Sequence, residues 1–273
     1  MNRMVPTGTE KVQIEVVDRV GVITFNRPER RNALHDEMYA PMIAAIEAFA
    51  ESADVGCVVV TGQGSAFCAG GDVRDGSGGR ADGSRPSRDE RIARLATNSR
   101  LSVLLHEAPI VTIAAVNGAA VGAGMSIALA CDLRIASSSA RFIGGWSRLG
   151  FSGDFGGPWL LANRVGPSKA LELLAANLTV DADEALRLGI VDRVVSSDVF
   201  DREWRAWAAM FATGPQTAIG FIKDNIGNAS RLSLAEAILV EAEHQVDSSL
   251  TADHREGVRA WIDKREPLFG RGE

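Results

Sequence analysis

The sequence lacks the features of disulfide-rich, zinc-binding, membrane-spanning and nucleic-acid-binding proteins. Its three cysteines, Cys57, Cys68 and Cys131, form no CxxC motif, and four histidines are scattered along the chain, so neither a disulfide framework nor a zinc site is expected. No apolar run reaches the roughly 18 residues of a membrane span, and the N-terminus has no hydrophobic signal segment, which predicts a cytoplasmic protein without a membrane partner. A net charge of −6 and a pI near 5.4 argue against nucleic acid as a partner.

What is present is an ordinary composition for a folded α/β protein. Hydrophobic residues make up 46% and charged residues 23% of 273 residues, enough for a sizeable core. Apolar patterning predicts strands at 12–17, 20–25, 57–61, 110–116, 132–136, 140–143 and 190–195, and helices at 33–51, 91–106, 159 onward, 168–174, 181–189 and almost throughout 198–266. Strands alternating with helices, then helices alone, predict an α/β core followed by a C-terminal helical portion.

The chain is organised around the stretch from Ile113 to Asp132. An apolar strand breaks at Asn117-Gly118 and passes through Gly122-Ala-Gly124 into a helix of small residues. Glycine lets a ligand approach the backbone, and a helix N-terminus offers unpaired N–H donors. The third glycine of a dinucleotide fingerprint is absent, since Ile127 stands in its place. Two interpretations remain: a turn that stabilises some other anion, or a helix packed closely against a sheet.

Two further glycine-rich segments flank this stretch. The first is Ala66–Asp72, and the second is 144–157, which contains Trp146, Arg148 and Asp154. From the residues alone, Asp154 is a carboxylate near a helix N-terminus, where the helix dipole stabilises it. The run 74–90 is rich in Gly, Ser, Arg and Asp, which predicts a mobile loop, either a lid or plain disorder.

Five motifs in a fixed order resemble the enoyl-CoA hydratase/isomerase (crotonase) superfamily. They are Asn26–Leu34, Ala66–Asp72, Ala114–Gly124, Cys131-Asp132 and Ala185–Asp192, and the resemblance extends from about Val12 to Phe269. It implies an α/β crotonase (ClpP-like) spiral of ββα units over residues 1–197. It also implies a C-terminal helical oligomerisation region over 198–273 that builds homotrimers or hexamers.

The resemblance further implies an acyl-CoA thioester substrate and no separate cofactor, because coenzyme A enters with the substrate. Members of the family hold the thioester oxygen with two backbone N–H groups, which by position are those of Gly71 and Ala123, next to Gly70 and Gly122. The residues expected near coenzyme A are Arg31, Ala33, Ala69, Asp72 and Val73, with Arg30, Arg31 and Lys223 either meeting phosphates or remaining solvated surface charges. Leu149, Phe151 and Trp159 are candidates for the acyl pocket.

The chain departs from the hydratases of this family at two positions. Where hydratases carry their two glutamates, this sequence has Ser126 and Trp146, and neither side chain is a carboxylate base. Asp154 stands where some isomerases and aryl-CoA dehalogenases of the family carry their reactive carboxylate. The resemblance therefore favours double-bond isomerisation with Asp154 as acid/base. The alternatives are a dehalogenase- or hydrolase-like use of Asp154 and an inactive acyl-CoA-binding protein. Trp146 is either an apolar wall or an indole donor to Asp154.

Overall fold

Two β-sheets form the centre of the computed structural model, which describes residues 3–72 and 86–270. The seven-stranded sheet has the order β1-β2-β3-β4-β6-β8-β11, and the four-stranded sheet has the order β10-β9-β7-β5. The larger sheet contains β1 (Arg3–Val5), β2 (Val12–Val17), β3 (Val20–Phe25), β4 (Cys57–Gly62), β6 (Val111–Val116), β8 (Leu133–Ser137) and β11 (Arg193–Val195). The smaller contains β5 (Ala66–Cys68), β7 (Ala119–Val121), β9 (Arg141–Ile143) and β10 (Thr179–Asp181).

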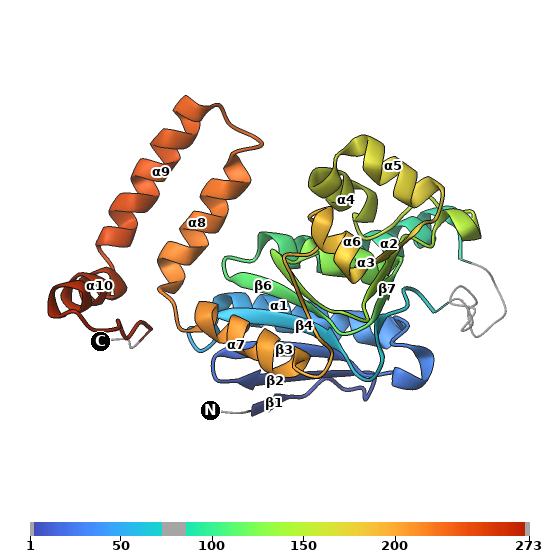
Figure 1. The fold of residues 1–273 in the computed structure, drawn as a ribbon, viewed down its shortest axis with the longest axis horizontal. Helices are drawn as coiled ribbons and strands as arrows, with labels where there is room; N and C mark the ends of the chain where they lie inside the picture. Colours follow the sequence, from blue (N-terminus) through green and yellow to red (C-terminus); the bar gives the residue numbers. More distant parts are fainter. Residues whose placement is uncertain (1–2, 73–85, 271–273) are drawn as a thin grey trace.

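Helices cover both faces of these sheets and form the whole C-terminal part of the described chain (Figure 1). They are α1 (Asp36–Glu51), α2 (Arg88–Glu107), α3 (Ala123–Ala130), α4 (Gly157–Val165), α5 (Pro167–Ala175), α6 (Ala182–Arg187), α7 (Phe200–Ala212), α8 (Gln216–Asn228), α9 (Leu234–Ser249) and α10 (Ala252–Asp263). The chain also forms two short 3₁₀ helices, Pro28–Arg30 and Ser147–Leu149.

The chain repeats a unit of a long strand, a short strand and a helix. In the central unit, β6 is buried along its whole length, as expected for a parallel strand covered on both faces. The chain then leaves the larger sheet at Asn117, whose Nδ2 donates to Gly64 O at 2.8 Å, and enters the smaller sheet as β7. Sequence patterning predicted a glycine-rich turn here. The strand forms because β5 and β9 flank it and supply its backbone hydrogen bonds.

The core occupies both faces of the larger sheet. One cluster joins β2 to β8 with helices α1 to α4, and it includes Phe25, Phe67, Ile127 and Phe142. The other lies on the opposite face, where α7 packs its Trp204 and other apolar residues against the sheet. Thus α7 lies inside the range 198–273 yet covers the α/β core, while the domain boundary at 197 stays a prediction.

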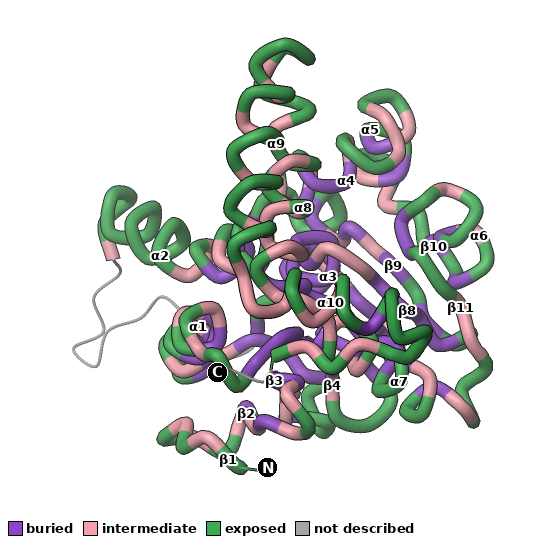
Figure 2. The backbone as a smooth tube through the Cα atoms, turned by 90° about the vertical axis from the view of Figure 1, so that its left-hand side faces the viewer, coloured by how far each residue is buried: buried purple, intermediate pink, exposed green. Residues whose placement is uncertain are grey.

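Helices α8, α9 and α10 extend from this body (Figure 1). Neither α8 nor α9 contains a buried residue, and Figure 2 shows α9 as exposed and intermediate along its length. Several large apolar side chains on these helices are more than half exposed, among them Ile226, Leu239 and Trp261. Among the described helices, none is both long and apolar enough to cross a membrane. A cytoplasmic location stays a prediction.

Three expected boundaries shift for local reasons. The first helix begins at Asp36, three residues after the expected start, because His35 is its N-cap and accepts from Glu37 N. Helix α2 begins at Arg88 because Ser87 and Glu90 form a capping box, so the end of the expected loop is helical. The last strand of the larger sheet spans only Arg193–Val195. The rest of the loop, 74–85, lies outside the described residues.

Candidate active site

Three glycine-rich segments meet at one edge of the smaller sheet. The neighbouring strands β5, β7 and β9 run parallel, so their C-terminal ends lie on the same side. The segment 69–72 follows β5, Gly122 and α3 follow β7, and the segment 144–157 follows β9. Sequence analysis singled out these three segments, and the sheet brings them together.

Two backbone N–H groups lie unpaired where the first two segments touch. A Cβ built on Gly70 would lie 2.8 Å from Val121 O and 3.5 Å from Ala123 N. Gly70 and Gly122 have φ values of +84° and +55°, a region that glycine adopts without strain. Within residues 3–72 and 86–270, the N–H groups of Gly71 and Ala123 donate to no other group. Ala123 opens α3, so the positive end of the helix dipole adds to its N–H.

Asp154, on the third segment, is held near these two N–H groups by a hydrogen bond from Trp146. The indole Nε1 of Trp146 donates to Asp154 Oδ1 at 3.0 Å, and a Cβ built on Gly122 would lie 3.8 Å from the same nitrogen. The interpretation of Trp146 as an indole donor is therefore confirmed. Asp154 does not cap α4, because the N-cap is Gly156 and no side chain bonds there. The carboxylate is thus held beside the N-terminus of α3.

The ionisation of Asp154 is balanced between two opposing effects. Partial burial raises its pKa above the ordinary value of an aspartate, and the hydrogen bond from Trp146 lowers it. Burial is the larger effect, so the pKa is raised. No other described acidic group contributes to this shift. A carboxylate with a raised pKa is a better acid and base near neutral pH.

Ser126, the residue in place of a hydratase glutamate, binds the backbone of Asp154. Its Oγ donates to Asp154 O at 3.0 Å and also lies 3.3 Å from Gly122 O. A Cβ on Gly157 would collide with Ser126 Oγ and lie 2.5 Å from Trp146 Cη2. Glycine at 157 therefore permits the close packing of Ser126, Trp146 and the turn that carries Asp154.

The residues expected near coenzyme A lie on two segments that run side by side. Ala69 N donates to Arg31 O at 3.0 Å, and Leu34 N donates to Gly70 O at 2.8 Å. Ala33 is buried and Ala69 half-buried, whereas the Arg31 side chain is exposed. Asp72 is buried and pairs with Arg27 at 3.0 Å. Val73 lies outside the described residues, and contact of any of these residues with coenzyme A stays a prediction.

Two other expectations have different outcomes. Lys223 is engaged inside the fold, because its Nζ lies 2.8 Å from Asp132 Oδ2 and 3.3 Å from Ile110 O. A role of Lys223 in phosphate binding stays a prediction. Leu149, Phe151 and Trp159 all have exposed side chains, 60%, 59% and 62% exposed, and a role in an acyl pocket stays a prediction for them.

Other chemistries find little support in the described part of the chain. Cys68 lies next to this site, but burial raises the pKa of its thiol to about 12, which makes it a poor nucleophile. No group of three or more potential metal ligands occurs among the described residues. The reactive candidates are therefore the Asp154 carboxylate and the two backbone donors.

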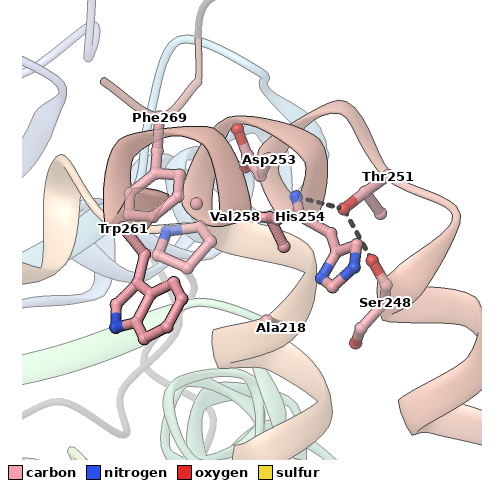
Figure 3. Close-up of a pocket in the computed structure, with 10 residues that line it drawn as sticks. Ala218, Ser248, Thr251, Asp253, His254, Val258, Trp261 and Phe269 are labelled. Carbon is pink, nitrogen blue, oxygen red and sulfur yellow. Dashed lines mark hydrogen bonds between the residues drawn. The ribbon is translucent and has the colours of Figure 1, made fainter. Parts of the chain in front are cut away.

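A cavity of about 370 Å³ lies between the C-terminal helices and contains none of these residues (Figure 3). Trp261 and Phe269 line its apolar part. The Thr251 side chain caps α10, since its Oγ1 donates to Ser248 O and accepts from His254 N. Of the described residues that line this cavity, only Asp253 carries a carboxylate, and its Oδ1 accepts from Gly270 N at 2.9 Å.

Sequence reasoning missed one residue of the site. Tyr39 on α1 stacks its ring on Phe155, with centroids 5.8 Å apart and planes at 23°. Nothing in the local pattern marks Tyr39, because a buried aromatic residue on an amphipathic helix is ordinary core. Its place beside the residue after Asp154 follows from tertiary packing.

Known proteins share this fold over nearly the whole chain. The family model described as enoyl-CoA hydratase/isomerase matches residues 15–272. A probable enoyl-CoA hydratase of Rhodobacter capsulatus is 34% identical over 94% of this chain and 97% of its own length. The 1,2-epoxyphenylacetyl-CoA isomerase of Escherichia coli is also 34% identical, over 92% of this chain and 94% of its own length.

Solved structures agree with this similarity. An enoyl-CoA hydratase from Polaromonas sp. JS666 superposes with a TM-score of 0.87 at 32% identity, covering 94% of this chain and 98% of that one. An enoyl-CoA hydratase described as putative, from Thermobifida fusca in complex with CoA, has a TM-score of 0.80 at 31% identity, covering 93% and 95%. The two-sheet arrangement that carries Asp154 and the backbone donors is thus the crotonase fold.

Proposed function

Because the chain belongs to the enoyl-CoA hydratase/isomerase family, we propose that it shifts a double bond within an acyl-CoA thioester, with Asp154 as the acid/base. The observation that carries this proposal is the Asp154 carboxylate, hydrogen-bonded to Trp146 at 3.0 Å, beside two unpaired N–H groups. The relative from Escherichia coli that is named 1,2-epoxyphenylacetyl-CoA isomerase supports the broader class, isomerisation of an acyl-CoA.

The proposed reaction begins when the thioester oxygen accepts hydrogen bonds from the N–H groups of Gly71 and Ala123. Asp154, as the carboxylate, removes a proton from C2 of a 3-enoyl thioester, and the electron pair delocalises into a dienolate whose oxygen carries the negative charge. The protonated Asp154 then returns the proton to C4, which leaves a 2-enoyl thioester. Preorganised donors at such an oxygen contribute about 2.7–4 kcal/mol each.

Hydration is disfavoured by the side chains that surround Asp154. Addition of water across a double bond requires groups that activate the water and protonate the adjacent carbon. Ser126 donates its hydroxyl to Asp154 O, and Trp146 donates its indole N–H to the carboxylate. Neither side chain accepts a proton near neutral pH, so a single carboxylate is left to carry one proton from carbon to carbon.

We also propose that coenzyme A lies along residues 31–34 and 69–72, and that the chain forms a homotrimer or a dimer of trimers. The adjacency of these two segments supports the first proposal. The second is supported by the exposed apolar side chains of α8, α9 and α10.

The decisive experiment compares wild type with Asp154→Asn on trans-2-enoyl, 3-enoyl and aryl-CoA thioesters. Asparagine keeps an oxygen that can accept from Trp146 but removes the base. We expect 3-enoyl isomerase activity in the wild type and a fall in kcat of about 10²–10⁴-fold in the variant, the usual contribution of a general base.

Asp201→Asn is the matched control. Asp201 Oδ1 accepts from the indole of Trp204 at 3.1 Å on α7, so the control alters a similar Trp–Asp pair far from the site and is expected to keep wild-type kcat. Full isomerase activity in Asp154→Asn would overturn the proposal. Binding of thioesters without turnover of any would instead identify an acyl-CoA-binding protein.

A second candidate function uses the same carboxylate as a nucleophile. In a dehalogenase-like reaction, Asp154 would attack the halogen-bearing aromatic carbon of an aryl-CoA, and halide would leave as an aryl ester of Asp154 forms. In a hydrolase-like reaction, it would attack the thioester carbonyl carbon and displace the coenzyme A thiolate. Water would then cleave either covalent intermediate. The Trp146–Asp154 hydrogen bond favours this candidate as well, because it orients the carboxylate. Halide release from a halogenated aryl-CoA, with an adduct on Asp154 detected by mass spectrometry, would select it over isomerisation.

A further inference from the structure

The residue after Asp154 has an unfavourable backbone conformation. Phe155 has φ of +51°, a left-handed value that residues with a Cβ rarely adopt without support from their surroundings. Gly156 follows with φ of +75°, so the turn that carries the carboxylate contains two consecutive left-handed residues. Some contact must hold Phe155 in this conformation.

Tyr39 supplies such a contact from a distant part of the sequence. It lies in the first turns of α1 and is 8% exposed, while Phe155 is 4% exposed. Their rings stack with centroids 5.8 Å apart and planes at 23°. Offset stacking of two buried rings is favourable and directional. The stack therefore fixes the ring, and with it the backbone, of the residue bonded to Asp154.

The Asp154 carboxylate also affects the ionisation of Tyr39. Burial raises the pKa of Tyr39, the nearby Cys68, Asp36 and Asp154 raise it further, and Arg94 lowers it. Among the described residues, the Tyr39 hydroxyl forms no hydrogen bond, so the contact of Tyr39 with the turn is made by the ring.

We propose that Tyr39 is a positioning residue for Asp154, acting through the aromatic ring of Phe155. The inference rests on the proposed function of Asp154 as acid/base. Ser126 holds the Asp154 carbonyl at 3.0 Å and Trp146 holds the carboxylate at 3.0 Å. Tyr39 completes the set by holding the next residue, so the direction of the carboxylate is fixed from three separate elements.

The test separates the ring of Tyr39 from its hydroxyl. Tyr39→Phe keeps the stack, whereas Tyr39→Leu keeps an apolar side chain without it. We expect Tyr39→Phe to retain kcat within about threefold and Tyr39→Leu to lose up to about 100-fold in kcat, the effect of a small misplacement of a catalytic group. KM is expected to change little in either variant. Phe211→Leu, which removes a ring from the Trp207–Phe211 pair on α7, is the control for general loss of aromatic packing.

A double-mutant cycle tests whether Tyr39 acts on Asp154 through the ring of Phe155. If Tyr39 acts through Phe155, the variant Tyr39→Leu/Phe155→Leu loses no more kcat than the more affected single variant. Additive losses would overturn the proposed route. Equal losses in Tyr39→Phe and Tyr39→Leu would show that the hydroxyl acts directly, and unchanged kcat in Tyr39→Leu would show that the stack has no role. Either result overturns the proposal.

A spectroscopic measurement is independent of turnover and of folding yield. Tyr39 is the only tyrosine in the sequence, so 3-fluorotyrosine gives one ¹⁹F signal. We expect its shift to follow a titration that disappears in Asp154→Asn and persists in Asp36→Asn, the control for the other nearby carboxylate. A titration that Asp154→Asn leaves unchanged would overturn the inferred proximity. Full isomerase activity in Asp154→Asn would overturn the proposed function. An inactive Asp154→Asn together with a fully active Tyr39→Leu would overturn only the proposal for Tyr39.

Discussion

At the scale of single residues, Asp154 depends on Trp146 for its state of charge. The indole N–H stabilises the ionised carboxylate, and burial opposes it. Trp146→Phe removes the donor and keeps most of the apolar side chain, so the pKa of Asp154 should rise further. The base must be ionised to remove a proton, and the acid limb of the kcat/KM profile should therefore move to higher pH.

This prediction is checked by measuring kcat/KM for a 3-enoyl thioester between about pH 4 and 9. The loss in Trp146→Phe should be largest at low pH and partly recovered at high pH. Trp204→Phe is the matched control, since it breaks a Trp–Asp hydrogen bond of 3.1 Å on α7, and its profile should match that of the wild type. A limb that moves to lower pH would contradict the assigned effect of the indole.

The sequence predicted some residues of the site and not others, for physical reasons. Gly71 and Ala123 lie in motifs whose order resembles the family, and Asp154 stands at a position where some members carry their reactive carboxylate. The sequence therefore singles out all three, and their catalytic roles stay predictions. The sequence did not decide whether Trp146 is an apolar wall or an indole donor, because the two roles differ in where the ring points. Tyr39 was missed, since a contact between α1 and the residue after Asp154 has no signature in local sequence.

At the scale of elements, the start of α3 determines the second backbone donor. Ala123 is the first residue of this helix, the position at which proline is well tolerated because its missing N–H has no helical partner. Ala123→Pro should therefore keep α3 and remove one N–H from the site. We expect kcat to fall by about 10²–10³-fold, the loss typical of one oxyanion donor.

Ala123→Gly is the control, because it removes the side chain and keeps the N–H. It should retain kcat within about tenfold, and thermal melting should show both variants folded. Equal activity of Ala123→Pro and Ala123→Gly would exclude Ala123 N–H as a donor to the thioester oxygen. A large fall in melting temperature for Ala123→Pro alone would mean that proline had displaced the contact between Gly70 and α3.

Helices and strands were predicted correctly where the local pattern of residues determines them. They were missed where a strand forms only through hydrogen bonds to neighbouring strands. Strands β2, β3 and β4 alternate or run apolar, and they occur where expected. Strand β7 has three residues between glycines, Ala119–Val121, and becomes a strand only because β5 and β9 lie beside it. The start of α2 was misplaced since its cap, Ser87, lies within a polar run that resembled a loop.

At the scale of the whole molecule, the C-terminal helices leave an apolar surface uncovered in the single chain. Ile226, Leu234, Leu239 and Trp261 are 70%, 77%, 67% and 82% exposed, and α8 and α9 have no buried residue. Large exposed apolar patches usually mark sites of interaction with a partner. A second and third copy of this chain would remove the surface from water.

We therefore expect sedimentation equilibrium to give three or six times the chain mass of 29.0 kDa. A variant with Ile226→Glu and Leu239→Glu places charges on the exposed faces of α8 and α9 and should shift the mass to that of one chain. Leu171→Glu, at a position 69% exposed on α5, adds a charge outside these helices and should leave the mass unchanged. A wild type that sediments as a single chain would contradict the prediction, and the apolar faces of α8 to α10 would then require a different partner.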